Sequence, residues 1–191
     1  MDRLVVKLFG GIFCLKDYIN KTKFQFCRSI LLRFYNSYLE KRNCYIGYRS
    51  QIKSPPIFPH GLSGIYISNN AIIGSDVVIY HQVTIGSNGL PDSGRFGSPR
   101  VLDNCILGAG SKIIGNCTVG ENTRVGANAV VVDDIPANSI VVLQKSKVIT
   151  KEQPLINRYY QKRNGKWGYI RDESFIYETD NLIVNRLNEK N

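Results

Sequence analysis

The feature that most constrains the fold of this chain is an aliphatic residue that returns at every sixth position. After a first pair, the repeat runs over four positions, breaks, and resumes over six more. A period of six matches neither the 3.6-residue period of a helix nor the two-residue alternation of a long strand. The repeated positions are Ile46, Ile52, Ile67, Ile73, Ile79, Ile85, Val101, Leu107, Ile113, Val119, Val125 and Val131.

This period predicts short extended segments joined by sharp turns. Three segments make one triangular coil of 18 residues, with the aliphatic residues of successive coils stacked inside. A single coil cannot bury its own inner face, so stacking supplies the core. Glycine often follows the aliphatic residue, as at Gly74 and Gly108, and we expect it to permit positive φ at the corners. We therefore predict an all-β solenoid, a parallel β-helix, over residues 44–142.

Two insertions interrupt the period. The segment KSPPIFPHGLSGIY separates Ile52 from Ile67, and GSNGLPDSGRFGSPR separates Ile85 from Val101. A solenoid tolerates insertions only at its corners, where loops face solvent or a neighbour and often carry function. The first insertion contains His60, one of only two histidines in the chain, so we single it out as a candidate site.

The two ends of the chain differ from the repeat. Residues 1–43 place apolar residues at helical spacing among lysines and arginines, which predicts two helices that break near residues 18–22. This segment either docks on protein, including a trimer contact, or lies as a basic amphipathic helix on an anionic membrane. Residues 143–191 form a C-terminal extension, a cap or a subunit contact, that ends in a short polar helix. Its aromatic residues alternate as in strands: Trp167, Tyr169, Phe175 and Tyr177.

Composition excludes several classes of site. Two histidines, His60 and His81, cannot supply three histidine ligands to a metal, and we expect no metal. Five cysteines without a C-x-x-C pair fit neither a disulfide framework nor a zinc ribbon, which predicts reduced thiols in the cytoplasm. The chain has no run of 18 apolar residues, so we expect no membrane-spanning helix. The excess of 25 Lys and Arg over 15 Asp and Glu predicts an anionic partner of unspecified kind.

Residues 44–150 resemble the hexapeptide-repeat acyltransferases, in particular the serine acetyltransferase-like branch with its polysaccharide O-acetyltransferase members. The similarity is carried by GIYISNNAIIGSDVVIYHQVTIG and by CILGAGSKIIGNCTVGENTRVGANAVVVDDIPANSIV. It implies a left-handed coil, acetyl-CoA as the acyl donor, and a homotrimer with active sites between subunits. Serine acetyltransferases carry a catalytic histidine eight residues after a repeat isoleucine, the spacing of Ile52 and His60. The resemblance therefore implies that His60 is the general base.

One histidine suffices for this chemistry because acetyl-CoA is already an activated thioester. The acceptor hydroxyl needs only to lose its proton as it attacks, and a neutral imidazole suits that role. His81, in YHQVTIG, lies about one coil further along. It could orient His60, bind the acceptor, act as the base itself or be an ordinary surface histidine, and the sequence leaves these alternatives open.

Two positions depart from the serine acetyltransferase pattern. Pro59 stands where the family has an acid before the histidine, and Ser98 stands where it has a second histidine before a proline. Both family residues serve the amino-acid substrate, so we expect a different acceptor: a sugar hydroxyl on a capsular or surface polysaccharide or on its precursor. Asp92 and Arg95, in the second insertion, are the candidate contacts to this acceptor. The alternative is a serine O-acetyltransferase.

The CoA site also follows from the resemblance. The family holds the pantetheine arm in a groove between coils and has a G-x-P-A segment near the nucleotide past the last coil. At the position of the G-x-P-A segment, this chain reads LQKSKV. Lys145 and Lys147 in this stretch could bind phosphate as point charges, and a solvated basic tail explains them equally well. By matching motif, the groove residues are Gly86, Ala109, Ser111, Gly126 and Ala127.

Three other functions compete with an acetyltransferase. γ-type carbonic anhydrases share the β-helix but need three zinc-binding histidines. A non-catalytic β-helix could be a scaffold or an ice-binding module, but ice binders need flat ranks of threonine, and the outer positions here are mixed and charged. A nucleic-acid binder would use the positive charge, but no aromatic-basic motif supports it, and we expect no nucleic-acid partner. We predict a cytoplasmic enzyme, with peripheral contact of the N-terminal segment on the inner membrane face as an open alternative.

Overall fold

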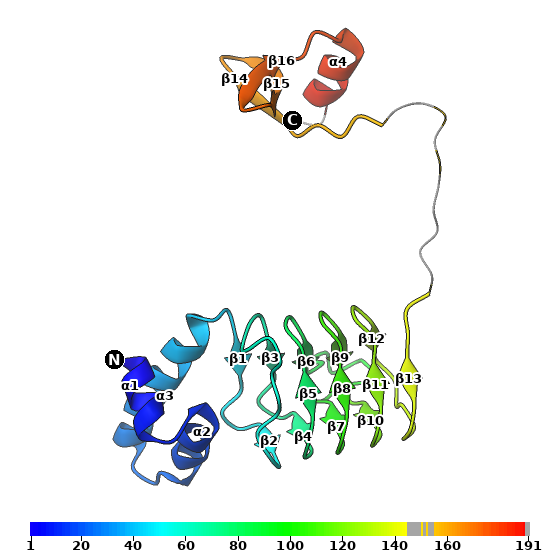
Figure 1. The fold of residues 1–191 in the computed structure, drawn as a ribbon. Coiled ribbons are helices and arrows are strands. Elements are labelled where there is room, and N and C mark those ends of the chain that lie inside the picture. Colours follow the sequence, from blue (N-terminus) through cyan, green and yellow to red (C-terminus); the bar gives the residue numbers. More distant parts are fainter. Residues whose placement is uncertain (145–149, 151, 153–154, 190–191) are drawn as a thin grey trace. The chain divides into compact units, whose positions relative to one another are not determined.

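The computed structural model describes residues 1–144, 150, 152 and 155–189, and Figure 1 shows the course of the chain. The chain divides into two compact units, Met1–Lys145 and Ser146–Asn191. The first unit contains three helices followed by a β-helix, and the second contains a small sheet and one helix. Among the described residues, no helix is long and apolar enough to cross a membrane.

The β-helix is built from three parallel sheets that the chain visits in turn. Each strand pairs with the equivalent strand one coil away, so Ile67 lies beside Ile85 and Ile85 beside Ile113. The first sheet contains β1 (Tyr45–Ile46), β3 (Tyr66–Ile67), β6 (Thr84–Gly86), β9 (Lys112–Ile114) and β12 (Val130–Val131). The second contains β2 (Gln51–Ile52), β4 (Ile72–Ile73), β7 (Arg100–Val101) and β10 (Thr118–Val119). The third contains β5 (Val78–Ile79), β8 (Ile106–Leu107), β11 (Arg124–Val125) and β13 (Ile140–Val141).

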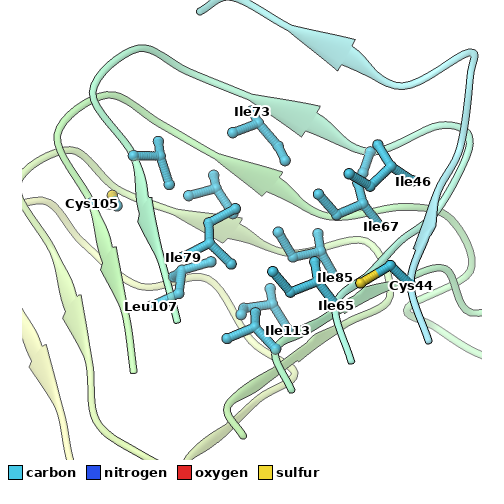
Figure 2. Close-up of a cluster of buried hydrophobic side chains, with 14 of the residues drawn as sticks. Cys44, Ile46, Ile65, Ile67, Ile73, Ile79, Ile85, Cys105, Leu107 and Ile113 are labelled. Atoms are coloured by element: carbon cyan, nitrogen blue, oxygen red, sulfur yellow. The ribbon is translucent and has the colours of Figure 1, made fainter. Parts of the chain in front are cut away.

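The core consists of the repeated aliphatic residues, which point inward from all three sheets as the period predicts. Ile67, Ile79 and Ile85 are completely buried, and Figure 2 shows them among the other inward side chains. The small or β-branched residue two positions earlier is also inside, as Ala71 and Val83 illustrate. Each coil thus buries its apolar residues largely against the neighbouring coils.

The corners correct our expectation for the repeat glycines. Positive φ falls instead on Asp76, Asn104 and other short polar residues, whose side chains tolerate the left-handed region. The glycines after the aliphatic residues are needed because the next coil comes too close for a side chain. A Cβ on Gly108, for example, would lie 2.7 Å from the backbone nitrogen of Ala127.

The N-terminal segment forms three helices rather than the two that we expected. These are α1 (Asp2–Leu8), α2 (Ile12–Lys21) and α3 (Gln25–Glu40). The additional break falls at Gly10 and Gly11, where φ is +78° and +122°, a region that favours glycine. The helices pack on the first coil, and the Tyr35 hydroxyl donates a hydrogen bond of 2.8 Å to the Ile46 carbonyl.

The C-terminal unit is an antiparallel sheet followed by a helix. Trp167 and Tyr169 lie on one of its strands and Phe175 and Tyr177 on the next, as their alternation predicts. The expected short polar helix follows the sheet. The elements are β14 (Tyr160–Arg163), β15 (Lys166–Arg171), β16 (Ser174–Tyr177) and α4 (Asn181–Glu189).

Candidate active site

The two histidines of the chain lie in direct contact. Nδ1 of His60 is 2.8 Å from Nδ1 of His81, and the ring centroids are 4.9 Å apart. The residues are 21 positions apart in sequence, and the winding of the coil brings them together. They lie at the corner where the chain passes from the third sheet to the first, which we call the histidine corner.

The first insertion is held firmly on the coil on both sides of His60. Ile57 takes the place of a third-sheet strand: its amide donates to Val77, and its carbonyl accepts from Ile79, both at 2.9 Å. The ring of Phe58 stacks on that of Phe13 from helix α2, with centroids 6.0 Å apart. A turn closed by a hydrogen bond from the Gly61 amide to the Phe58 carbonyl then presents His60 to solvent.

His81 is set in the regular coil, directly after strand β5. Its carbonyl accepts a hydrogen bond of 3.0 Å from the amide of Gly110 in the next coil. The side chain is half-buried, whereas that of His60 is exposed. The neighbouring Tyr80 presents its ring edge-on to His60, with centroids 5.2 Å apart. Sequence reasoning missed Tyr80 and Phe58, although each lies within two residues of a histidine.

The contact between the two rings couples their tautomers. A hydrogen bond between two Nδ1 atoms requires one ring to donate and the other to accept. If His60 donates, its Nε2 carries a free lone pair and can take a proton, while Nε2 of His81 keeps its hydrogen. If His81 donates, the roles are exchanged. In either arrangement, one ring has a free lone pair on Nε2 and the other ring holds it in that tautomer.

Several of the expected CoA residues lie at the histidine corner. Ala109 and Ala127 occupy the equivalent positions in the next two coils, and the Ala109 carbonyl accepts from the Asn128 amide one coil away. Gly126 precedes Ala127 there. Gly86 instead ends strand β6 of the first sheet, where a Cβ would lie 3.0 Å from the Ile114 side chain. The two coils next to the histidines thus carry small side chains in this column.

Three other predicted cofactor residues are placed differently or lie outside the described residues. The Ser111 side chain is fully buried inside the coil, and its hydroxyl has no hydrogen-bond partner among the described residues. It therefore does not face a groove on the surface, because its position alternates inward with the aliphatic residues. Lys145 and Lys147 lie outside the described residues.

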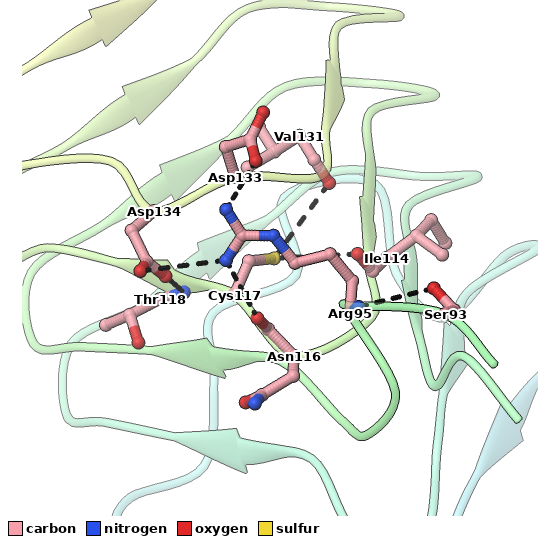
Figure 3. A network of polar contacts seen from close by, with 9 residues as sticks. All are labelled: Ser93, Arg95, Ile114, Asn116, Cys117, Thr118, Val131, Asp133 and Asp134. Atoms are coloured by element: carbon pink, nitrogen blue, oxygen red, sulfur yellow. Dashed lines mark hydrogen bonds and ion pairs between the residues drawn. The ribbon is translucent and has the colours of Figure 1, made fainter. Parts of the chain in front are cut away.

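The second insertion lies at a different corner from the histidines, between the first and second sheets. Figure 3 shows the Arg95 guanidinium paired with the carboxylates of Asp133 and Asp134, the latter at 3.8 Å. These contacts tie the loop to a later coil, so Arg95 anchors the loop instead of standing free for an acceptor. Asp92 is exposed at the tip of the same loop. Within one chain, the fold does not bring Asp92 or Arg95 to His60.

Ser98 lies near the end of the same loop, where the resemblance would place a second histidine. Its hydroxyl forms a hydrogen bond of 2.6 Å with the hydroxyl of Ser87 at the start of the loop. The pair closes the base of the insertion. A partner for His60 therefore comes from the next coil, as His81, and not from this loop of the same chain.

The chain matches one protein family and a group of similar enzymes. Residues 98–133 match the family described as bacterial transferase hexapeptide (six repeats). A serine acetyltransferase from Mycobacterium tuberculosis is 42% identical over 98 residues, which cover 51% of this chain and 42% of that protein. The chain spans about half the length of the curated relatives that it matches.

Solved structures give the same result. Soybean serine acetyltransferase complexed with serine has a TM-score of 0.59 and 26% identity, covering 72% of this chain and 54% of that one. A serine acetyltransferase in complex with CoA has a TM-score of 0.56 and 27% identity, covering 68% and 50%. The repeat and these neighbours imply that the coil is left-handed.

The comparisons overturn one expectation from the sequence. We expected a sugar hydroxyl of a capsular or surface polysaccharide as the acceptor, but the relatives and structures found are serine acetyltransferases. That expectation rested on Pro59 and Ser98 and could not foresee that His81 supplies a partner for His60 from the next coil. By its repeat, its fold and these relatives, the β-helix of this chain is similar to the hexapeptide-repeat acyltransferases, and its residues 98–133 match the family model.

Proposed function

We propose that this chain is an acetyl-CoA-dependent O-acetyltransferase that acetylates the hydroxyl of L-serine. The observation that carries the proposal is the His60–His81 pair, whose Nδ1 atoms are 2.8 Å apart at a corner of small residues. The similarity to serine acetyltransferases, two of them solved with serine and with CoA, supports the choice of acceptor and donor.

His60 is the proposed base because it is the more exposed of the two rings. In this assignment Nδ1–H of His60 donates to Nδ1 of His81, which leaves Nε2 of His60 free to accept a proton. His81, half-buried and fixed in the coil, then selects the tautomer of His60 and holds its ring in place. When Nε2 of His60 takes a proton, the imidazolium that forms keeps its hydrogen bond to neutral His81.

The reaction needs no acyl-enzyme. The serine hydroxyl loses its proton to Nε2 of His60 as its oxygen attacks the carbonyl carbon of the thioester, and a tetrahedral intermediate forms. The intermediate collapses by breaking the carbon–sulfur bond, and His60 returns the proton to the departing thiolate. The products are O-acetylserine and CoA, and both substrates must be bound together.

The proposed path of CoA runs along the histidine corner, beside Ala109, Gly126 and Ala127, where small side chains leave room for the pantetheine arm. The roles of Lys145 and Lys147 at the nucleotide stay predictions. A homotrimer with active sites between subunits also stays a prediction. Contact of the N-terminal helices with a membrane is likewise a prediction, consistent with the exposed side chains of Leu8 and Phe24 beside basic residues.

The test is acetyl transfer by the purified chain from acetyl-CoA to L-serine. Free thiol should appear at a rate that depends on L-serine, and mass spectrometry should find serine with one added acetyl group. L-Alanine is the matched control, because it differs from serine only by the missing hydroxyl. Thiol release that is the same with serine and alanine, with no acetylserine formed, would rule out this function.

A further inference from the structure

An open cavity lies on the opposite side of the β-helix from the histidine corner. It is lined by helix α2 and by the second sheet, has a volume of about 490 Å³, and includes Lys16, Arg49 and Lys53. In a triangular coil, the second sheet is the face opposite the corner between the third and first sheets. The cavity is therefore separate from the site of the proposed acetyl transfer.

The charges around this cavity are mostly positive. Lys16, Arg49 and Lys53 contribute three cations, against the single carboxylate of Asp17 in the lining. Lys53 is already paired with Asp103 at 2.6 Å, outside the lining. The Arg49 side chain donates only to the neutral hydroxyl of Tyr48, at 2.9 Å, among its contacts within the described residues. Among the described residues, Arg49 thus pairs with no carboxylate, and the carboxylate nearest to Lys16 is 4.0 Å from its ammonium.

Lys16 is the unusual member of this group because it is almost completely buried. Only 3% of the residue is exposed, and its ammonium donates to the Ser50 carbonyl at 2.6 Å. The nearest carboxylate, that of Asp17, is 4.0 Å away and itself 65% exposed. Within the described part of the chain, one carbonyl is the acceptor found for an ammonium with three donors. Buried charges are costly unless they are paired, and burial lowers the pKa of the Lys16 ammonium.

Part of the cavity lining is apolar. Ile52, Ile72 and Ile73 of strands β2 and β4 contribute to the lining, and the side chains of Asn20 and Gln51 add polar groups. A fitting ligand therefore combines a negatively charged group with a short apolar part. Free chloride or sulfate would satisfy only the first of these features.

We propose that this cavity binds a small organic anion through a carboxylate or phosphate group held by Lys16 and Arg49. The apolar part of the ligand lies over Ile52 and Ile72. The ammonium of Lys16 supplies a desolvated, charge-assisted hydrogen bond, and the guanidinium of Arg49 supplies a second from the rim.

The experiment is an NMR titration of the full-length, isotope-labelled chain with two probes, inorganic phosphate and butyrate, at constant ionic strength. At least one probe should cause saturable shifts of the Ser50 and Gln51 amides and of the Asn20 side-chain amide. Butyrate should bind more tightly than inorganic phosphate, because it alone carries an apolar part. If neither probe gives saturable shifts at these positions, the proposal is wrong. The measurement needs no enzymatic activity, so it stands or falls independently of serine acetylation.

Variants test the two anchoring cations. Lys16→Met and Arg49→Gln should each weaken binding by at least about tenfold, the loss typical of one charge-assisted hydrogen bond. Arg49 is exposed, so its variant keeps the fold even if Lys16→Met changes the packing of helix α2. Lys21→Met, at the exposed end of the same helix and outside the lining, is the matched control and should bind as the wild type does. Wild-type affinity in Arg49→Gln would overturn the proposal.

Discussion

In the β-helix, each coil buries its aliphatic residues against the next coil. The sheet of the C-terminal unit is stabilised largely by contacts between side chains at its surface. Ile67, Ile79 and Leu107 are completely buried. In the described part of the C-terminal unit, by contrast, Gly168 and Tyr169 are the residues that are buried. The two regions are thus stabilised by different interactions.

The C-terminal unit relies on rings, cations and one carboxylate. The Arg158 and Arg163 guanidinium groups lie 4.3 and 4.4 Å from the rings of Tyr169 and Phe175. The side chain of Glu178 is 7% exposed and accepts hydrogen bonds from the Tyr160 hydroxyl at 2.7 Å and from Arg158 at 3.0 Å. A sheet this small buries little apolar surface, so such contacts carry more of its stability.

This difference explains why the β-helix can be predicted from the sequence more readily than the C-terminal unit. The β-helix repeats the same arrangement of short strands coil after coil, so its pattern is visible in the sequence. Residues 98–133 of the chain match the hexapeptide family for this reason. The C-terminal unit depends on single pairings that occur once. Four predictions test this contrast, from the largest expected effect to the smallest.

The largest effect is expected at the histidine corner. His60→Ala should lower acetyl transfer to serine by about a hundredfold to ten-thousandfold, the usual contribution of a general base, with no change in the C-terminal unit. His81→Ala should reduce the rate less, because it removes only the residue that orients the base. Glu121→Gln, an exposed change at another corner, should keep the wild-type rate. A greater loss in His81→Ala than in His60→Ala would exchange the two roles.

The next largest effect is expected in the core of the coil. Ile79→Ala should lower the free energy of unfolding by about 2–5 kcal/mol, because it leaves a cavity between coils. Chemical denaturation should show this loss in the β-helix, while the aromatic signals of the C-terminal unit stay in place. Ile106→Ala on strand β8 is the matched control: its side chain points outward, and it should cost much less. Equal losses in the two variants would contradict the inward stacking.

A smaller and local effect is expected at Glu178. The Tyr160 hydroxyl and then the Asp180 amide lower the pKa of its carboxyl below the usual 4.5. Because the folded unit keeps Glu178 ionised at a lower pH than the unfolded chain does, this stabilisation is complete above pH 4.5 and is lost as the pH falls through the lowered value. Glu178→Gln should therefore loosen the C-terminal sheet at neutral pH and make it less sensitive to acid.

The measurement for Glu178 is amide exchange in strands β14 and β15, compared with exchange in the β-helix. Glu173→Gln, in the turn before β16, is the matched control, because its side chain is exposed. If Glu178→Gln changed exchange in the β-helix as much as in the sheet, the two regions would not be independently stabilised.

The smallest effect is expected at the second insertion. Arg95→Met removes two ion pairs of a side chain that is 42% exposed. It should therefore lower the free energy of unfolding by at most about 1 kcal/mol. Amides of residues 87–99 should exchange faster, while those of the strands stay protected. Arg100→Met, on an outward position of strand β7, should leave the loop unchanged. An unfolding loss of several kcal/mol would show that the loop supports the coil itself.

The sequence predicted the β-helix well because its information is periodic. Each of the repeated positions from Ile67 to Val131 lies inside the coil, as their spacing requires. The role of the glycines was predicted wrongly: the reason for Gly108 is the distance between coils, which a single chain segment does not reveal. The break at Gly10 and Gly11 was missed, since the apolar pattern continues across it.

The candidate site was predicted only in part. The sequence singled out both histidines, but it could not show that the coil places Nδ1 of His81 against Nδ1 of His60. Arg95 looked like a contact for an acceptor and proved to pair with Asp133 and Asp134, which follow it by some forty positions. Ser111 looked like a groove residue and lies inside.

By itself, the sequence determined the repeat, the coil that buries it and the scarcity of histidines, which leaves His60 and His81 as the candidates for a histidine base. The tertiary structure decided which side chains meet: His60 meets His81, and Arg95 pairs with two aspartates. It also decided that the buried Lys16 lines an open cavity. The physical reason is that burial follows a local period of hydrophobic residues. Contacts between side chains depend instead on how many residues each turn of the coil consumes, and the two insertions change that number.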